Sequence, residues 1–140
     1  MVNLKQSLID NQSICLGKEA QTWEDAIKLA ADPLIKSGAV EERYADAMIA
    51  LTVKYGPYYI LMPGMAMPHA RPEDGVIRDS FSLITLKEPV TFSDGKKVSV
   101  LLTLAATSSE IHASIAIPQI VAIFEIKDII NRLINAKTKE

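Results

Sequence analysis

The chain has 140 residues, of which 49% are hydrophobic and 23% charged, so we expect one sizeable core and one domain over residues 1–140. Its net charge is -2 and its 15 basic residues are scattered, which argues against nucleic acid as a partner. It shows no apolar stretch typical of a secretory signal or membrane span, and its single cysteine, Cys15, cannot close an internal disulfide, so we expect a cytoplasmic protein.

Helix and strand patterns alternate along the first half of the chain. We expect a short helix over residues 4–9 and a strand over 13–16. A longer helix is expected to follow the cap residue Thr22 and to end at Gly38. Another helix begins near Glu41, and residues spaced by three and four predict its buried face. These residues are Tyr44, Ala47, Met48, Leu51 and Tyr55.

The second half is richer in strands. An apolar run over residues 58–62 is expected to form a strand, and runs over 81–86 and 98–104 are expected to pair as a hairpin with a long connection. Two helices close the chain, the first capped at Thr107 with Glu110 completing a capping box. The pattern predicts an α/β (α+β) fold with a mixed central sheet of about five strands, flanked by helices on both faces.

Motifs for metal or nucleotide binding are absent from the sequence. The two histidines and one cysteine lie far apart, with neither a His-Glu-x-x-His helix nor a Cys-x-x-Cys pair. The glycines match neither a phosphate-binding loop nor a dinucleotide fingerprint. We therefore predict neither a metal ion nor a bound cofactor.

One histidine stands among residues that restrict the backbone. Pro68 fixes its own φ and pushes Met67 toward an extended conformation, while Gly64 permits a sharp change of direction. The strand end is thus expected to aim the side chain of His69. Neutral imidazole is nucleophilic near pH 7 and can take up and pass on a phosphoryl group. The alternative is a loop histidine with a structural hydrogen bond, and spacing alone leaves both open.

Two other residues could complete a phosphate site. Arg71 offers a planar positive fork to phosphoryl oxygens, or it is simply a solvated charge. His112 lies in the first turns of the helix capped at Thr107, where free N–H groups favour an anion. A lone histidine on an apolar helix is more often a core or capping residue. The phosphate hypothesis therefore requires the sheet to bring this helix end beside His69.

A family resemblance is carried by the run Pro63-Gly64-Met65-Ala66-Met67-Pro68-His69-Ala70-Arg71. It resembles the phosphorylation-site motif of the mannitol/fructose-type enzyme IIA domains of the bacterial phosphoenolpyruvate-dependent sugar phosphotransferase system (PTS). The resemblance covers nearly the whole chain, because further segments follow in the family's order. These are Thr22-Trp23-Glu24-Asp25-Ala26, Tyr44-x-x-Ala47, Gly56-Pro57-Tyr58-Tyr59, Pro89-Val90-x-Phe92 and His112. The Gly-Pro-Tyr and Pro-His-Ala-Arg-Pro-Glu-Asp-Gly stretches resemble most closely the ascorbate-specific IIA components.

The resemblance implies the family's fold and a phosphotransferase with a phosphohistidine intermediate. His69 would accept a phosphoryl group from the phosphocarrier HPr and donate it to a cysteine of a IIB component, in L-ascorbate uptake. His112 would be a second active-site histidine that stabilises the phosphoryl group without carrying it. Mannitol-type members place an arginine on the helix corresponding to residues 47–51, where this chain has Leu51. That positive charge is therefore absent here, or Arg71 supplies it as a phosphate clamp.

Two other functions stay open at this point. One is a regulatory module of the same fold, in which phosphorylation of His69 is a signal and not a transport step. The other is a catalytically inert binding domain that uses the loop around His69 only as a contact surface. As a carrier, the chain would meet the membrane only through the permease complex. The sequence leaves a homodimer open.

Overall fold

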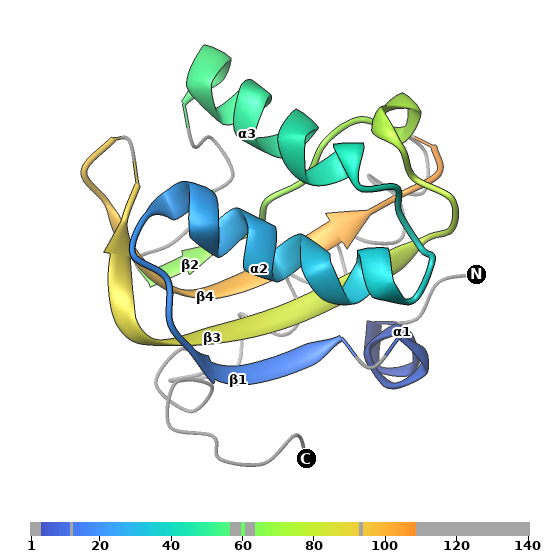
Figure 1. The fold of residues 1–140 in the computed structure, drawn as a ribbon, viewed down its shortest axis with the longest axis horizontal. Coiled ribbons are helices and arrows are strands. Elements are labelled where there is room, and N and C mark those ends of the chain that lie inside the picture. The colour runs from blue at the N-terminus through green and yellow to red at the C-terminus, as the bar shows by residue number, and fades with distance from the viewer. Residues whose placement is uncertain (1–3, 12, 57–59, 61–63, 93, 109–140) are drawn as a thin grey trace.

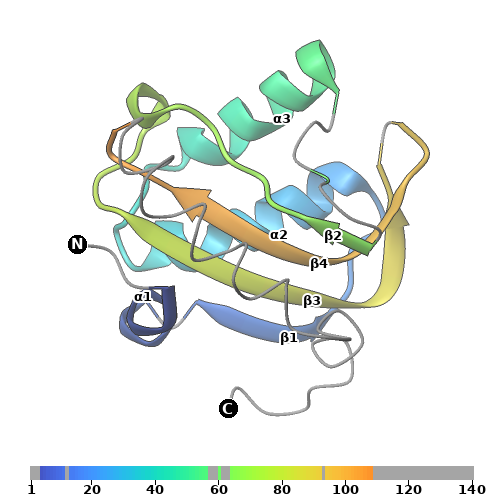
Figure 2. The ribbon, with the colours of Figure 1, turned by 180° about the vertical axis from the view of Figure 1, so that it is seen from behind.

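Four strands form one mixed sheet in the described part of the chain. The computed structural model describes residues 4–11, 13–56, 60, 64–92 and 94–108. Within them the strands lie in the order β1-β3-β4-β2, and helices pack against the sheet (Figures 1 and 2). The predicted α/β class with a mixed sheet is confirmed, although the described sheet has four strands where about five were expected.

Most elements lie where the sequence predicts them, with ends that differ by a few residues. The helices are α1 (Leu4–Asp10), α2 (Trp23–Lys36), α3 (Arg43–Tyr55) and the short 3-10 helix η1 (Pro72–Asp74). The strands are β1 (Ile14–Lys18), β2 (Gly64–Ala66), β3 (Ser80–Thr91) and β4 (Lys97–Ala105). Of the strand expected over residues 58–62 only Ile60 is described, and it lies outside any strand. The two closing helices fall on residues 109–140, outside the described part.

Strand directions determine which ends of the sheet elements meet. β1 runs parallel to β3, and β2 runs parallel to β4, whereas β3 and β4 are antiparallel. Phe81 near the start of β3 is the register partner of Leu104 near the end of β4. β2 and β4 therefore point toward the same end of the sheet, where β3 begins, although β2 itself ends beside Leu101 in the middle of β4. The loop that follows β2 and contains His69 continues toward this end, since the carbonyl of Pro68 accepts from the N–H of Leu104.

The predicted hairpin of β3 and β4 is confirmed, but the prediction of a long connection is wrong. β3 continues through Pro89 as far as Thr91, because the register shifts between Thr85 and Val90. Such an irregularity accommodates a proline, which has no N–H to give to the ladder. A tight turn then joins the strands, with Gly95 at φ 85.

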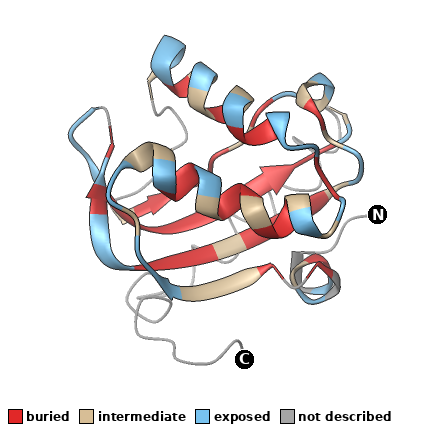
Figure 3. Ribbon diagram, in the orientation of Figure 1, coloured by how far each residue is buried: buried red, intermediate tan, exposed pale blue. Residues whose placement is uncertain are grey.

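Helices α2 and α3 share one face of the sheet, and core residues pack between them and the strands (Figures 1 and 3). The central strand β4 is buried on both faces, because all its residues after Lys97 are buried and successive residues face opposite sides. Thr22 caps α2 as predicted, and its side chain accepts from the N–H of Asp25 at 3.2 Å. The buried Ser82 hydroxyl of β3 donates to the carbonyl of Ala30 in α2 at 2.6 Å. None of the helices in the described residues is both long enough and apolar enough to cross a membrane.

The expected buried face of α3 is correct at its start and wrong at its end. Tyr44 and Met48 are fully buried, but Tyr55 is 62% exposed. The last turn of α3 projects past the sheet in Figure 1, so a residue there can share the apolar face without reaching the core. The start of α3 is thus the part fixed against the sheet and the loop that contains His69.

Candidate functional site

His69 lies in the loop between β2 and η1 and is half-buried. Its ring Nδ1 lies 2.9 Å from the carbonyl oxygen of Met67. A carbonyl oxygen can only accept a hydrogen bond, so Nδ1 carries the proton and donates. In the neutral ring Nε2 then holds the lone pair. The hydrogen bond from one ring nitrogen to a backbone carbonyl, expected of a nucleophilic histidine, is therefore present, and Met67 provides the carbonyl.

Burial keeps this imidazole neutral. Desolvation lowers the pKa of His69 below its ordinary value of 6.5, and the hydrogen bond to the Met67 carbonyl opposes this only partly. A neutral ring is the nucleophilic form, because protonation would occupy the lone pair on Nε2. The site thus presents a histidine that is ready to attack an electrophile near pH 7.

Both peptide groups that flank His69 are anchored to β4. The carbonyl of Pro68 accepts from the N–H of Leu104 at 3.2 Å. The N–H of Ala70 donates to the hydroxyl of Tyr44 at 3.0 Å, and this hydroxyl donates to the carbonyl of Leu104 at 2.6 Å. Leu104 therefore holds the backbone on each side of the histidine, once directly and once through a tyrosine.

The segment after the loop is tied to the start of α3. The N–H of Glu41 donates to the carbonyl of Gly75 at 2.8 Å, and the N–H of Ile77 donates to the carbonyl of Ala39 at 2.9 Å. Gly75 has φ 117, and a Cβ there would stand 3.2 Å from the Cβ of Glu41. A side chain would be strained at this position. Glycine thus permits the close approach that places the first turn of α3 beside the loop.

Arg71 is engaged within its own turn. Its backbone N–H donates to Asp74 Oδ2 at 2.9 Å, and its guanidinium reaches both carboxylate oxygens at 3.2 Å. Glu73 Oε1 lies 3.5 Å from Arg71 Nε. The hydrogen bonds from Arg71 lower the pKa of Asp74, so that carboxylate is ionised and offsets the arginine's charge. Leu51, which stands where mannitol-type members carry an arginine, is partly buried.

The second candidate histidine, His112, lies outside the described residues, as does Glu110 of the predicted capping box. Thr107, next to the last described residue of this segment, donates from both its N–H and its hydroxyl to Asp79 Oδ1, at 2.6 and 2.9 Å. Asp79 directly precedes β3. Thr107 is thus held at the same end of the sheet as the loop that contains His69.

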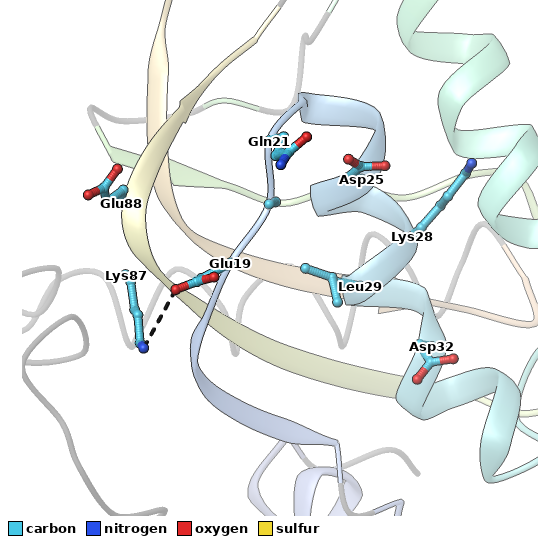
Figure 4. Close-up of a pocket in the computed structure, with 9 residues that line it drawn as sticks. Glu19, Gln21, Asp25, Lys28, Leu29, Asp32, Lys87 and Glu88 are labelled. Atoms are coloured by element: carbon cyan, nitrogen blue, oxygen red, sulfur yellow. Dashed lines mark ion pairs between the residues drawn. The ribbon is translucent and has the colours of Figure 1, made fainter.

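A groove of about 840 Å³ lies elsewhere, between α2, the segment that joins β1 to α2, and residues 87–88 of β3 (Figure 4). Side chains of both signs line it, and Lys87 pairs with Glu19 at 3.6 Å across its edge. Neither His69 nor Arg71 lines this groove. β1 ends where β4 begins, at the opposite end of the sheet from Leu104, so we place the chemistry in the loop and not in the groove. No group of three or more metal-ligating side chains occurs among the residues that the structure describes.

Sequence reasoning missed the two anchors, Tyr44 and Leu104, as parts of the site. The sequence places Tyr44 on the apolar face of α3 and in a segment that carries the family resemblance, but gives it no role in the site. The available signal was its hydroxyl, because a buried tyrosine usually finds a partner for its O–H. Leu104 acts through its backbone, and no side-chain pattern reveals that role.

A protein-family model matches residues 7–140, and its description is the phosphoenolpyruvate-dependent sugar phosphotransferase system, EIIA 2. The chain belongs to this family. The resemblance inferred from the run around His69 is therefore confirmed, and the chain is an EIIA component of a sugar phosphotransferase system.

Three relatives illustrate the similarity of this EIIA chain to known proteins. The ascorbate-specific PTS system EIIA component of Shigella boydii serotype 4 (strain Sb227) is 42% identical over 141 residues, 99% of this chain and 92% of that protein. The crystal structure of a putative PTS IIA (PtxA) from Streptococcus mutans has 64% identity and a TM-score of 0.96, covering 98% and 88% of the two chains. The enzyme IIA of the mannitol system of Escherichia coli, solved in complex with phosphorylated IIB, has 27% identity and a TM-score of 0.77, covering 91% and 89%.

Proposed function

We propose that this EIIA chain is a phosphoryl carrier in which Nε2 of His69 accepts phosphate from phospho-HPr and passes it to a cysteine of a IIB component. The observation that carries this proposal is the 2.9 Å hydrogen bond between His69 Nδ1 and the Met67 carbonyl. It assigns the proton to one nitrogen and leaves the other as nucleophile. We further propose that residues 1–140 act as one cytoplasmic domain that meets the membrane only through the permease.

The proton held on Nδ1 also favours phosphoryl transfer to and from Nε2. When Nε2 bonds to phosphorus and the donor's bond breaks, the ring gains positive charge. The Met67 carbonyl lies at Nδ1, where it stabilises that charge. When a thiolate on the IIB component attacks, the N–P bond breaks and the ring returns neutral as the leaving group. Loose phosphoryl-transfer transition states need mainly positioning and positive charge, and no metal is required.

Two other groups are proposed to act on the phosphoryl oxygens. We assign His112 to hydrogen bonding that stabilises the phosphorylated state, on the strength of the family resemblance. Arg71 is the remaining candidate for a positive clamp, because the family arginine is replaced by Leu51. In the structure Arg71 is engaged by Asp74. It would therefore have to exchange this carboxylate for the phosphoryl group.

L-Ascorbate is the proposed transported substrate. The support is the family membership together with the 42% identity, over nearly the full length, to a component that is named ascorbate-specific. The IIB partner is supported by the mannitol IIA relative, which was solved as a complex with its phosphorylated IIB. The sugar itself need not contact this chain, because only phosphate passes through it.

A relay assay tests the proposal. The protein is incubated with labelled phosphoenolpyruvate, enzyme I and HPr, and acid-labile label is measured. Candidate IIB components of the ascorbate and mannitol types are then added, and we expect label to move to the ascorbate type. Failure of the wild type to take up label would refute the carrier function. Label that enters but leaves to none of the IIB components would favour the regulatory module.

The pH dependence of His69 is a first expected result. Its pKa lies below 6.5 because burial disfavours the charged ring, so the nucleophilic form should persist as the pH falls to that value. The unfolded chain binds this proton more readily, so the free energy of unfolding should decrease as the pH falls from about 6.5, the ordinary value, to the lowered pKa of the folded protein, and should not change further through His69 below it. An NMR titration of the His69 ring protons measures the midpoint directly. A midpoint at or above 6.5 would contradict the assignment.

The role of Arg71 gives a second expected result. If Arg71 leaves Asp74 for the phosphoryl group, Asp74→Asn should strengthen the clamp and Arg71→Ala should remove it. We expect phosphohistidine to hydrolyse about 3-fold faster in Arg71→Ala and more slowly in Asp74→Asn, since exposed charge pairs have small effects. The measurement is the decay of purified labelled protein. Identical half-lives in wild type and both variants would show that Arg71 only shapes its turn.

A further inference from the structure

The histidine loop is connected to the sheet through a side chain that the phosphoryl chemistry does not itself require. Tyr44 is fully buried on α3, and its hydroxyl joins backbone groups of two other segments, the N–H of Ala70 in the loop and the carbonyl of Leu104 in β4. We propose that Tyr44 is a positioning residue, whose hydroxyl fixes the peptide after His69 and thereby the direction of Nε2. This inference rests on the proposed role of His69 as the phosphoryl acceptor.

Packing alone does not explain a tyrosine at this position. Phenylalanine has the same ring and would fill the core without bringing a polar group into it. The hydroxyl is retained in a buried setting where it both accepts and donates, and this is the combination that a bridge between an N–H and a carbonyl requires. Without it, the N–H of Ala70, which is itself a buried residue, would lose this partner.

Fixing this peptide matters because the backbone on either side of His69 sets where its imidazole can point. Its ring is bound to the carbonyl of Met67, two residues earlier in the same loop. The backbone before it is held by Leu104, and the backbone after it is held by Tyr44. In-line transfer needs the attacking nitrogen within about 3–3.5 Å of phosphorus and aligned with the leaving group, and a 1 Å displacement can cost about 100-fold in rate. Releasing one anchor would let the ring turn away from that line.

The test compares Tyr44→Phe with a matched control, Ser82→Ala. Both remove a buried hydroxyl that joins two elements, but the Ser82 bond to Ala30 links β3 to α2 and does not involve the loop. For Tyr44→Phe we expect kcat of transfer from phospho-HPr to fall about 10- to 100-fold with KM unchanged, because the exposed docking surface is the same. For Ser82→Ala we expect both constants to stay within about 2-fold of wild type.

Two spectroscopic readouts separate positioning from a general loss of stability. In Tyr44→Phe the ¹⁵N shifts of the His69 ring should show a smaller share of the Nδ1–H tautomer. Hydrogen exchange of the Ala70 amide should accelerate at least about tenfold, since it has lost its acceptor. Neither should change in Ser82→Ala. If Tyr44→Phe does not fold, hydrogen exchange of the Ala70 amide is measured in the wild type instead. Slow exchange supports the hydrogen bond to Tyr44, and exchange at the rate of an exposed amide overturns the proposal.

The outcomes distinguish this inference from the proposed function. A wild type that takes no label refutes the carrier function, whatever Tyr44 does. A labelled wild type with an unchanged kcat in Tyr44→Phe leaves the carrier function standing and overturns the positioning role. Equal losses of kcat in Tyr44→Phe and Ser82→Ala, with unchanged tautomer shares, also overturn it, because the effect would then be structural. A loss of kcat confined to Tyr44→Phe, with the tautomer shift, supports it.

Discussion

His69→Gln is expected to reduce phosphorylation by phospho-HPr to the background of the assay. Glutamine is close to histidine in size, and its amide N–H can still donate to the Met67 carbonyl that holds Nδ1 in the wild type. It offers no nucleophilic nitrogen, because the amide lone pair is delocalised. The variant should therefore unfold at the same urea concentration as wild type while accepting no acid-labile label. Labelling equal to wild type would place the phosphoryl group on another residue.

The matched control for this experiment is His112→Gln, which alters the only other histidine of the chain. In the proposed mechanism His112 stabilises the phosphoryl group and does not carry it. His112→Gln should therefore still accept label from phospho-HPr and pass it to the IIB component more slowly. Complete loss of labelling in a folded His112→Gln would show that this histidine has a larger part in the first transfer.

The loop around the proposed nucleophile, His69, could be singled out from the sequence, since prolines and a glycine around one ionisable side chain indicate a constrained backbone. A nitrogen bound to a carbonyl could also be expected on chemical grounds, but the identity of that carbonyl could not. Met67 supplies it because the loop folds back over two residues, and no pattern of residue types encodes that turn. The anchors were beyond prediction for a related reason: Leu104 acts through its peptide groups, and Tyr44 acts across 60 residues of sequence.

Arg71, two residues after His69, shows a different limit of sequence analysis. The sequence suggests Arg71 as a phosphate clamp and Leu51 as the residue in place of the family arginine, and both stay predictions. It gives no sign that Asp74, three residues after Arg71, binds both its backbone and its guanidinium. The short 3-10 helix Pro72–Asp74 brings this carboxylate back to the arginine. For Arg71 to act as the proposed clamp it would have to leave Asp74, and residue types alone do not reveal that contact.

For the fold, long periodic segments were predictable and irregular ones were not. α2 begins after its Thr22 cap as expected, because cap and apolar stripe agree. β3 was predicted too short, because Pro89 usually ends a strand and here lies within an irregular stretch of one. Spacing alone predicts that Tyr55 is buried. Spacing gives the face of the helix on which a side chain lies, but it does not show whether another element packs against that part of the face.

Phe81→Ala is expected to lower the free energy of unfolding by about 3–5 kcal/mol, the usual cost of deleting a fully buried phenylalanine. Phe81 is 0% exposed near the start of β3, at the end of the sheet where the loop leaves β2. A domain of this size has about 5–15 kcal/mol of stability in total, so the variant should still fold. Urea unfolding monitored by circular dichroism measures the loss, and Val53→Ala, at a residue 72% exposed, is the control with a change within about 0.5 kcal/mol.

Phe81→Ala also distinguishes residues that stabilise the fold from residues that position His69. The backbone of Phe81 bonds to Ser7 and Ser13, whereas its register partner Leu104 bonds to Pro68 and Tyr44 on the other side. Removing the phenyl ring leaves those anchors in place. The folded fraction of Phe81→Ala should therefore accept phosphate at nearly the wild-type rate, unlike Tyr44→Phe. A rate per folded molecule that falls as far as in Tyr44→Phe would mean that packing beneath β4, and not the tyrosine bridge, determines where Nε2 points.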